Sequence, residues 1–130
     1  MDDSIGTMME AIGGYFELEL QQGEEYHKDA LRLNTARNCF EYILFARNYK
    51  KVHIPYYTCE VLLQPLEKHH IAYEFYSINE KLEPVEIKTL LPGEAFLYTN
   101  YFGLKQCCVE KMVAIYGLSL IHISEPTRPY

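Results

Sequence analysis

Three predicted turns carry the side chains and glycines best suited to holding a small ligand. They span residues 34–37, 55–59 and 100–103. The first of them leads into a predicted helix that starts at Ala36, after the capping side chains of Asn34 and Thr35. Free amide groups at such a helix start, together with one arginine, are sufficient to hold a phosphate. The plain alternative for this turn is a capped helix with a solvated Arg37.

The elements that must position these turns alternate along the chain. Short apolar or β-branched runs predict strands, and apolar residues at helical spacing predict helices between them. The strands are expected at residues 30–33, 52–54, 72–78 and 94–99, and the helices from residue 36, after residue 58 and over 105–116. Alternating strands and helices are typical of an α/β fold with a partial doubly wound, mostly parallel sheet flanked by helices. Ligands bind such sheets outside the carboxyl ends of the strands, which is where the three turns are expected.

Composition and charge exclude several classes of function. The net charge is −6 and the sequence has no basic block, so a nucleic-acid interface is not expected. No stretch approaches the ~20 apolar residues of a membrane span, and the acidic start lacks a signal-peptide pattern. We therefore expect a cytoplasmic protein without a membrane partner. The cysteines are expected to be buried free thiols and no metal site is predicted; they are Cys39, Cys59, Cys107 and Cys108.

The two ends of the chain are interpreted separately from its centre. Residues 1–29 are expected to form an N-terminal arm, in which Tyr15 to Leu20 alternate weakly and could form a strand. Residues 118–130 are expected to be a non-native tail, because the segment from Leu118 to Arg128 matches the translation of a transposase adapter used in DNA sequencing libraries. The β-branched part of this tail, residues 119–123, is predicted to occupy the sheet position of the next native strand.

Four blocks in the centre of the chain resemble the DegT/DnrJ/StrS aminotransferases, a family of fold-type-I pyridoxal-phosphate proteins. The blocks are Gly-Gly-Tyr-Phe-Glu at 13–17, Asn-Thr-Ala-Arg-Asn at 34–38, Ile-Pro-Tyr-Tyr-Thr-Cys at 54–59 and Tyr-Thr-Asn-Tyr-Phe-Gly at 98–103. They keep the family's order within about residues 12–117. The resemblance implies that residues 30–117 are the N-terminal part of the large domain of such a transferase.

The resemblance also implies a cofactor, pyridoxal 5'-phosphate, and candidate residues that hold it. Thr35, Ala36 and Arg37 correspond to the family's phosphate-binding turn, although Ala36 stands where glycine is usual. The physical properties of a helix start and an arginine agree with this role. Cys59 stands where an aromatic side chain usually stacks on the pyridine ring, and Tyr57 is the candidate substitute. The alternative for this second turn is a pair of core or cleft tyrosines with a buried cysteine.

The resemblance further implies what the 130 residues lack. Transamination needs a lysine that forms a Schiff base with the cofactor and an acid that pairs with the pyridinium nitrogen, and in the family both lie beyond the block that ends near Gly117. The seven lysines after Lys28 are predicted to be solvated surface charges: Lys50, Lys51, Lys68, Lys81, Lys88, Lys105 and Lys111. We therefore expect no catalytic residue here and do not expect this fragment to retain the cofactor.

The parent protein implied by the resemblance transfers an amino group from an amino donor to a nucleotide-linked keto sugar, in polysaccharide biosynthesis, as a homodimer. Whether the parent is an active enzyme is left open by the sequence. Ala36 and Cys59 favour the alternative, a binding or regulatory protein that keeps the fold without catalysis.

Overall fold

The computed structural model describes residues 28–124 of the chain. The chain divides into two units, residues 1–31 and 32–130, and the fold given below is that of the second. The strand expected in the arm at Tyr15 to Leu20 lies outside the described residues.

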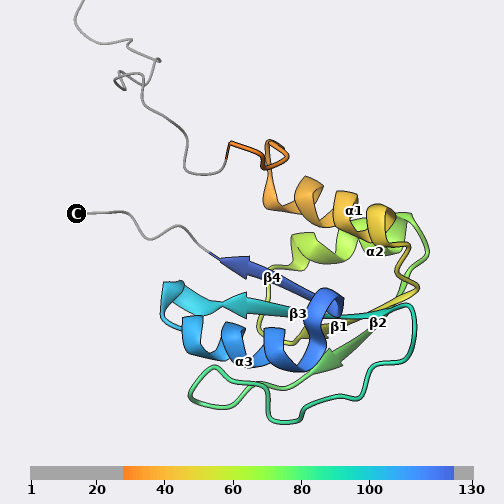
Figure 1. The fold of residues 1–130 in the computed structure, drawn as a ribbon. Helices are drawn as coiled ribbons and strands as arrows, with labels where there is room; N and C mark the ends of the chain where they lie inside the picture. The colour runs from red at the N-terminus through yellow and green to blue at the C-terminus, as the bar shows by residue number, and fades with distance from the viewer. Residues whose placement is uncertain (1–27, 125–130) are drawn as a thin grey trace, which may run out of the picture. The chain divides into compact units, whose positions relative to one another are not determined.

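A four-stranded sheet forms the centre of this unit, and every neighbouring pair of strands is parallel (Figure 1). The order across the sheet is β2-β1-β3-β4. The chain leaves β1 towards β2, then returns past β1 to form β3 and continues outward to β4. The strands are β1 (Lys51–Pro55), β2 (Ala72–Tyr76), β3 (Glu94–Asn100) and β4 (Leu120–Ser124). This arrangement confirms the predicted α/β class with a partial parallel sheet flanked by helices.

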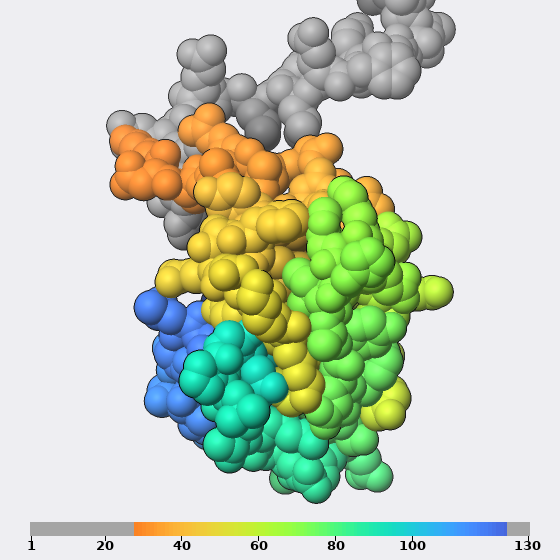
Figure 2. All heavy atoms as spheres, turned by 90° about the vertical axis from the view of Figure 1, so that its right-hand side faces the viewer, coloured from red at the N-terminus to blue at the C-terminus, as the bar shows by residue number. Residues whose placement is uncertain are grey.

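Helices cover both faces of the sheet. Figure 1 shows α1 and α2 on one face and α3 on the other, and Figure 2 shows α1 and α2 packed side by side. The helices are α1 (Ala36–Arg47), α2 (Leu63–Lys68) and α3 (Gln106–Tyr116), with short 3-10 turns η1 (Glu60–Leu62), η2 (Tyr101–Gly103) and η3 (Gly117–Ser119). None of the helices within residues 28–124 is long and apolar enough to cross a membrane.

The central strands are buried on both faces, as expected for a parallel sheet between two helical layers. Val52 and Ile54 of β1 face the core under α1 and α2, which also contains Phe40 and Leu44. Alternate residues of β3 point to the opposite face, where Phe96, Tyr98 and Tyr76 pack with the α3 residues Cys108, Val109 and Met112. Both faces of β1 and β3 are therefore covered by packed side chains.

Helix α1 begins at the predicted residue, Ala36. The Thr35 hydroxyl accepts a hydrogen bond from the Asn38 amide at 3.1 Å, which caps the first turn. Arg47 lies in the last turn, where the helix dipole favours a cation. Asn48 then adopts a left-handed conformation (φ 53°) and its amide bonds back to the helix carbonyls, which ends the helix.

Two local predictions are wrong. Residues 30–33 form no strand, and Leu31 and Leu33 remain 58% and 40% exposed, so their side chains provide too little burial to fix one. The second helix, expected directly after residue 58, starts later, because the chain forms η1 first and α2 begins only at Leu63. This later start places Pro65 in the first turn of α2, where a missing amide proton costs little.

The segment from Leu120 to Ser124 pairs in parallel along β3, so the β-branched stretch that was expected to enter the sheet forms a strand in it. That this is the position of the next native strand stays a prediction. Ile121 is 5% exposed and completes the core under α1. The Tyr49 hydroxyl donates to the Leu118 carbonyl at 2.6 Å and fixes the entry to the strand. Gly117 precedes it with φ 52° and ψ −125°, a conformation that favours glycine.

Candidate functional site

The three predicted ligand turns meet in one cleft at the carboxyl edge of the sheet. The cleft has a volume of about 470 Å³, within the usual range for small-molecule sites. It lies between the ends of β1 and β3, where the order of strands reverses, which is the typical ligand position in a doubly wound sheet. Its lining comprises Ala36, Arg37, Tyr57, Thr58, Cys59, Val61, Leu62, Thr99, Tyr101, Phe102 and Ile123.

The amino end of α1 forms one side of the cleft through Ala36 and Arg37. Figure 1 shows this end of the helix on the same side of the fold as the arrowheads of β3 and β4. The first amides of a helix have no intrahelical acceptor, so those of Ala36 and Arg37 are available to an anion. Thr35 is not part of the lining, and its hydroxyl oxygen is occupied by the Asn38 amide. Its role is to cap the helix rather than to line the cleft.

Among the described residues, Arg37 carries the one charge in the lining of the cleft. Its Nη1 donates to Oε1 of Gln64 on α2 at 2.8 Å. Within residues 28–124 no acidic side chain lies at ion-pair distance from this guanidinium. The hydrogen bond to a neutral amide therefore orients Arg37 without neutralising it, and the positive charge remains available to a phosphate.

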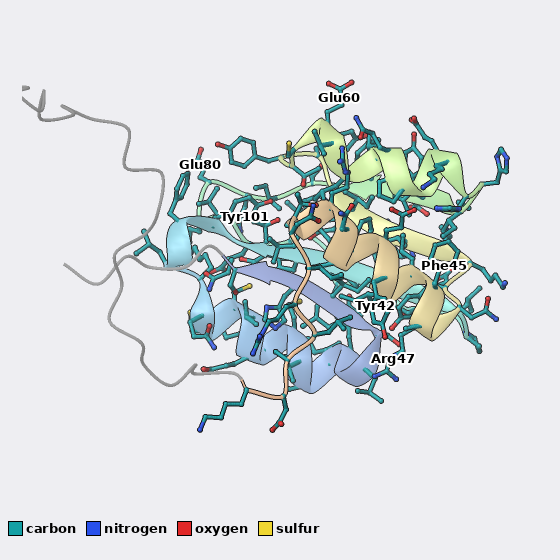
Figure 3. The ribbon with its side chains drawn as sticks, turned by 90° about the horizontal axis from the view of Figure 1, so that it is seen from above. Tyr42, Phe45, Arg47, Glu60, Glu80 and Tyr101 are labelled. Atoms are coloured by element: carbon teal, nitrogen blue, oxygen red, sulfur yellow. The ribbon has the colours of Figure 1, made fainter. Side chains whose placement is uncertain are left out.

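Aromatic side chains form another wall of the cleft. The Tyr57 and Tyr101 rings are stacked, with centroids 5.5 Å apart and planes 21° apart. Tyr101 is 5% exposed, whereas Tyr57 and the neighbouring Phe102 are 57% and 63% exposed. Figure 3 shows Tyr101 at the carboxyl end of β3, away from Arg47 at the far end of α1. The exposed ring faces of Tyr57 and Phe102 suit a planar ligand.

Cys59 also lines the cleft, but as an exposed side chain rather than a buried one. The expectation of buried thiols is correct for Cys108, while Cys39 is half-buried and Cys107 is exposed. All are free, in agreement with the prediction of free thiols. Cys59 is exposed because it lies at the start of the η1 turn, outside the end of the sheet.

The opposite, amino half of the sheet carries a compact charge network. Lys51 Nζ lies 2.8 Å from Glu74 Oε2 and 3.7 Å from Glu94 Oε1. His53 is 4% exposed, with Nε2 3.2 Å from Glu94 Oε2, while its buried Nδ1 has no hydrogen-bond partner among the described residues. The prediction of solvated lysines is wrong for Lys51, Lys88 and Lys105. The sheet register places Glu74 and Glu94 beside Lys51, while Lys88, in the connection before β3, lies 3.4 Å from Glu74 and Lys105 lies 3.5 Å from Glu83.

Hydrogen bonds shift the titration of both carboxylates in this network. The Leu91 amide donates to Glu94 at 3.0 Å and, with smaller contributions from His53 and Lys51, lowers the pKa of Glu94. The bonds from Lys51 and Lys88 lower the pKa of Glu74. No group of three metal-ligating side chains within residues 28–124 is placed to hold a metal ion. The network therefore joins three strands electrostatically and offers no open site.

Sequence reasoning missed several residues of the cleft. Phe102 lies in the third predicted turn and Thr99 directly precedes it, so both could have been predicted from the position of that turn. Val61 and Ile123 contribute apolar surface, and their sequence context gave no indication of it. Ile123 in particular comes from β4, whose place beside β3 brings it to the cleft.

The lining fits part of the cofactor that the family resemblance implies. Two helix amides and Arg37 suit its phosphate, and the apolar and aromatic wall suits its ring. In the described part of the chain, the lining holds no lysine for a covalent link and no carboxylate for the ring nitrogen. No family model, no curated protein and no solved structure matches this chain.

Proposed function

We propose that the cleft binds the phosphate and ring of pyridoxal 5'-phosphate, and that residues 30–117 are the N-terminal part of an aminotransferase-like protein. The observation that carries the proposal is the convergence of the three turns around Arg37, at a helix start, which has no acidic partner within residues 28–124. The proposed parent acts on a nucleotide-linked keto sugar, with an amino donor as second substrate, and functions as a homodimer. Its proposed location is the cytoplasm.

Each side of the cleft has a distinct role in this proposal. The amides of Ala36 and Arg37 and the Arg37 guanidinium hold the phosphate, since all three offer donors and positive potential. Tyr57 supports one face of the ring. When bound, the cofactor supplies the electron sink on which transamination depends. The residues of this chain orient the group and exclude water from one face of it.

The chain of 130 residues is proposed to be inactive in transamination. Three partly buried lysines form ion pairs with carboxylates: Lys51, Lys88 and Lys105. None of them lines the cleft. Without a covalent link, binding of the cofactor rests on the phosphate and ring contacts, so we expect it to be weak. Cofactor-dependent turnover by the purified chain would contradict this part of the proposal.

A non-catalytic binding or regulatory role is the second candidate, and one specific observation favours it. Ala36 and Cys59 both line the cleft, at the positions where the family pattern has glycine and an aromatic side chain. The Ala36 methyl group restricts the approach of a phosphate to the backbone. Cys59 provides no ring for stacking. Both features weaken cofactor binding without changing the fold.

The test is a titration of the isotope-labelled chain with pyridoxamine 5'-phosphate, which has the ring and phosphate but cannot form an imine with lysines. We expect chemical-shift changes that start with the amides of Ala36 and Arg37. Arg37→Gln should weaken binding about tenfold, equivalent to about 1.4 kcal/mol. Arg47→Gln, a change of the same kind at the other end of α1, should leave the affinity unchanged. Equal effects of both variants, or shifts elsewhere, would contradict the proposed site.

A further inference from the structure

We propose that Tyr101 is a positioning residue that fixes the turn after β1 and so holds the Tyr57 ring as a wall of the cleft. The inference rests on the proposed function for its ligand, but its geometry is independent of that ligand. The Tyr101 hydroxyl donates to the Tyr57 carbonyl at 2.7 Å. The same two residues stack their rings at 5.5 Å. A buried side chain of one turn thus holds both the backbone and the ring of an exposed residue in another.

The turn after β1 has few other anchors. Its remaining backbone hydrogen bonds lie at its two ends, from the Tyr56 amide to the Tyr76 carbonyl at 2.9 Å and from the Leu62 amide to the Cys59 carbonyl at 3.0 Å. Between these ends, the bond from Tyr101 is the one that reaches the centre of the turn in the described structure. Loss of this bond would leave the position of Tyr57 to weak contacts.

Tyr101 is itself held rigidly. It is 5% exposed, and its ring packs edge-on against Tyr98 with centroids 5.9 Å apart. The Leu104 amide donates to its carbonyl at 3.0 Å, and the Lys105 amide donates to the Asn100 side chain at 2.7 Å. These bonds close a tight turn that places Phe102 at a positive φ of 56° and directs it outward. A strained non-glycine residue beside a cleft is typical of functional sites.

The hydroxyl keeps its proton under all ordinary conditions. Burial raises the pKa of Tyr101 to about 12, so the group is a neutral donor at physiological pH. Its bond to the Tyr57 carbonyl therefore does not respond to moderate changes of pH. Any effect of pH on ligand binding must arise elsewhere, for example from the ionisation of a ligand phosphate.

The experiment compares two conservative variants of the full chain. Tyr101→Phe removes the hydroxyl and keeps the ring. Tyr116→Phe is the matched control, because the Tyr116 hydroxyl also donates to a backbone carbonyl, that of Lys88 at 2.9 Å, and its ring also stacks, on Phe96 at 4.7 Å. Tyr116 is not part of the cleft lining.

We expect Tyr101→Phe to weaken binding of pyridoxamine 5'-phosphate about fivefold and to speed hydrogen exchange of the Tyr56 and Leu62 amides, whose hydrogen bonds flank the turn. The ring-current shifts of the bound ligand should decrease, which a purely structural role would not cause. Tyr116→Phe should change none of these readouts. Equal affinity and equal exchange in Tyr101→Phe and the unaltered chain would overturn the inference.

The two proposals fail in different ways. Absence of shifts at Ala36 and Arg37 in the unaltered chain contradicts the proposed cofactor site. In that case the exchange rates of the Tyr56 and Leu62 amides still decide whether Tyr101 positions the turn. If binding occurs and both variants weaken it equally, the cofactor site is supported and the special role of Tyr101 is rejected.

Discussion

The two ends of the sheet differ in whether their basic side chains are paired with carboxylates. At the amino half, Lys51 and Lys88 are balanced by Glu74 and Glu94 across neighbouring strands. At the carboxyl edge, Arg37 is oriented by a neutral glutamine and has no acidic partner within the described residues. The lysines of the amino half are therefore neutralised by carboxylates, whereas the Arg37 guanidinium keeps its positive charge among the described residues. A charged side chain that the fold orients but does not neutralise is available to a ligand. This difference separates the carboxyl edge, as a candidate binding site, from the amino half, whose charges stabilise the sheet.

Loss of a carboxylate at the amino half should have the largest effect on stability. Glu94 accepts hydrogen bonds from Leu91 and His53 and lies beside Lys51. Glu94→Ala should lower the free energy of unfolding by about 1.5–3 kcal/mol, measured by urea denaturation near neutral pH. Glu86→Ala, which removes a carboxylate with a 74% exposed side chain, should change it by less than about 0.5 kcal/mol. A similar loss in both variants would show that the network is not structurally special.

Adding a charge at the carboxyl edge should affect binding rather than stability. Gln64→Glu places a carboxylate beside the Arg37 guanidinium and neutralises it, so binding of pyridoxamine 5'-phosphate should weaken about tenfold. Gln64→Met, which removes the hydrogen bond without adding charge, should weaken it by less. Calorimetric titration of both variants separates the two contributions. An unchanged affinity in Gln64→Glu would mean that Arg37 does not contact the ligand.

Acid should destabilise the chain through the amino half of the sheet. The native pKa of Glu94 lies below the ordinary value of 4.5, so its ionised form stabilises the fold above that pH. This contribution is lost as the pH falls from 4.5 through the lowered native pKa. Urea denaturation from about pH 7 to about pH 3 should therefore show a smaller loss of stability in Glu94→Gln than in the unaltered chain. Parallel curves would assign the acid sensitivity to other carboxylates.

The smallest expected effect is on thiol reactivity. Cys59 lines the cleft and Cys107 lies exposed on α3, so both should react with a small thiol reagent. Saturating pyridoxamine 5'-phosphate should slow labelling of Cys59 about two- to threefold, through partial cover of an exposed side chain. Labelling of Cys107 should not change. Mass spectrometry of the labelled peptides measures both rates in one sample.

The local sequence pattern predicted most of the fold because β1 and β3 are short, largely apolar or β-branched runs, while α1 and α3 are long enough to show a helical period. It failed at residues 30–33, where two leucines resemble a strand but find no partner. It also failed for Lys51, whose ion pairs depend on the register of three strands and cannot be inferred from neighbours in sequence. Local propensity predicts individual helices and strands, whereas contacts between strands depend on how the folded chain brings distant residues together.

The candidate site could be predicted in part for the same reason. Turns at element ends located the site, and the family resemblance named its candidate residues. The structure brings Ala36, Arg37, Tyr57 and Cys59 together, but not Thr35. The importance of Tyr101 depends on a bond to a residue far away in sequence, with a separation of 44 positions. Only the packed fold reveals such a bond.

The fourth strand illustrates how differently the positions of a sheet depend on their sequence. Pro55 and the three residues before it are all buried in β1, whereas β4 buries Ile121 and leaves its other side chains partly or wholly exposed. Backbone hydrogen bonds to β3 supply much of what holds β4, and those are available to almost any sequence. An edge position can therefore accept a segment of foreign origin, as residues 118–130 are expected to be, whereas the sequence of β1 must fit the side chains on both of its faces.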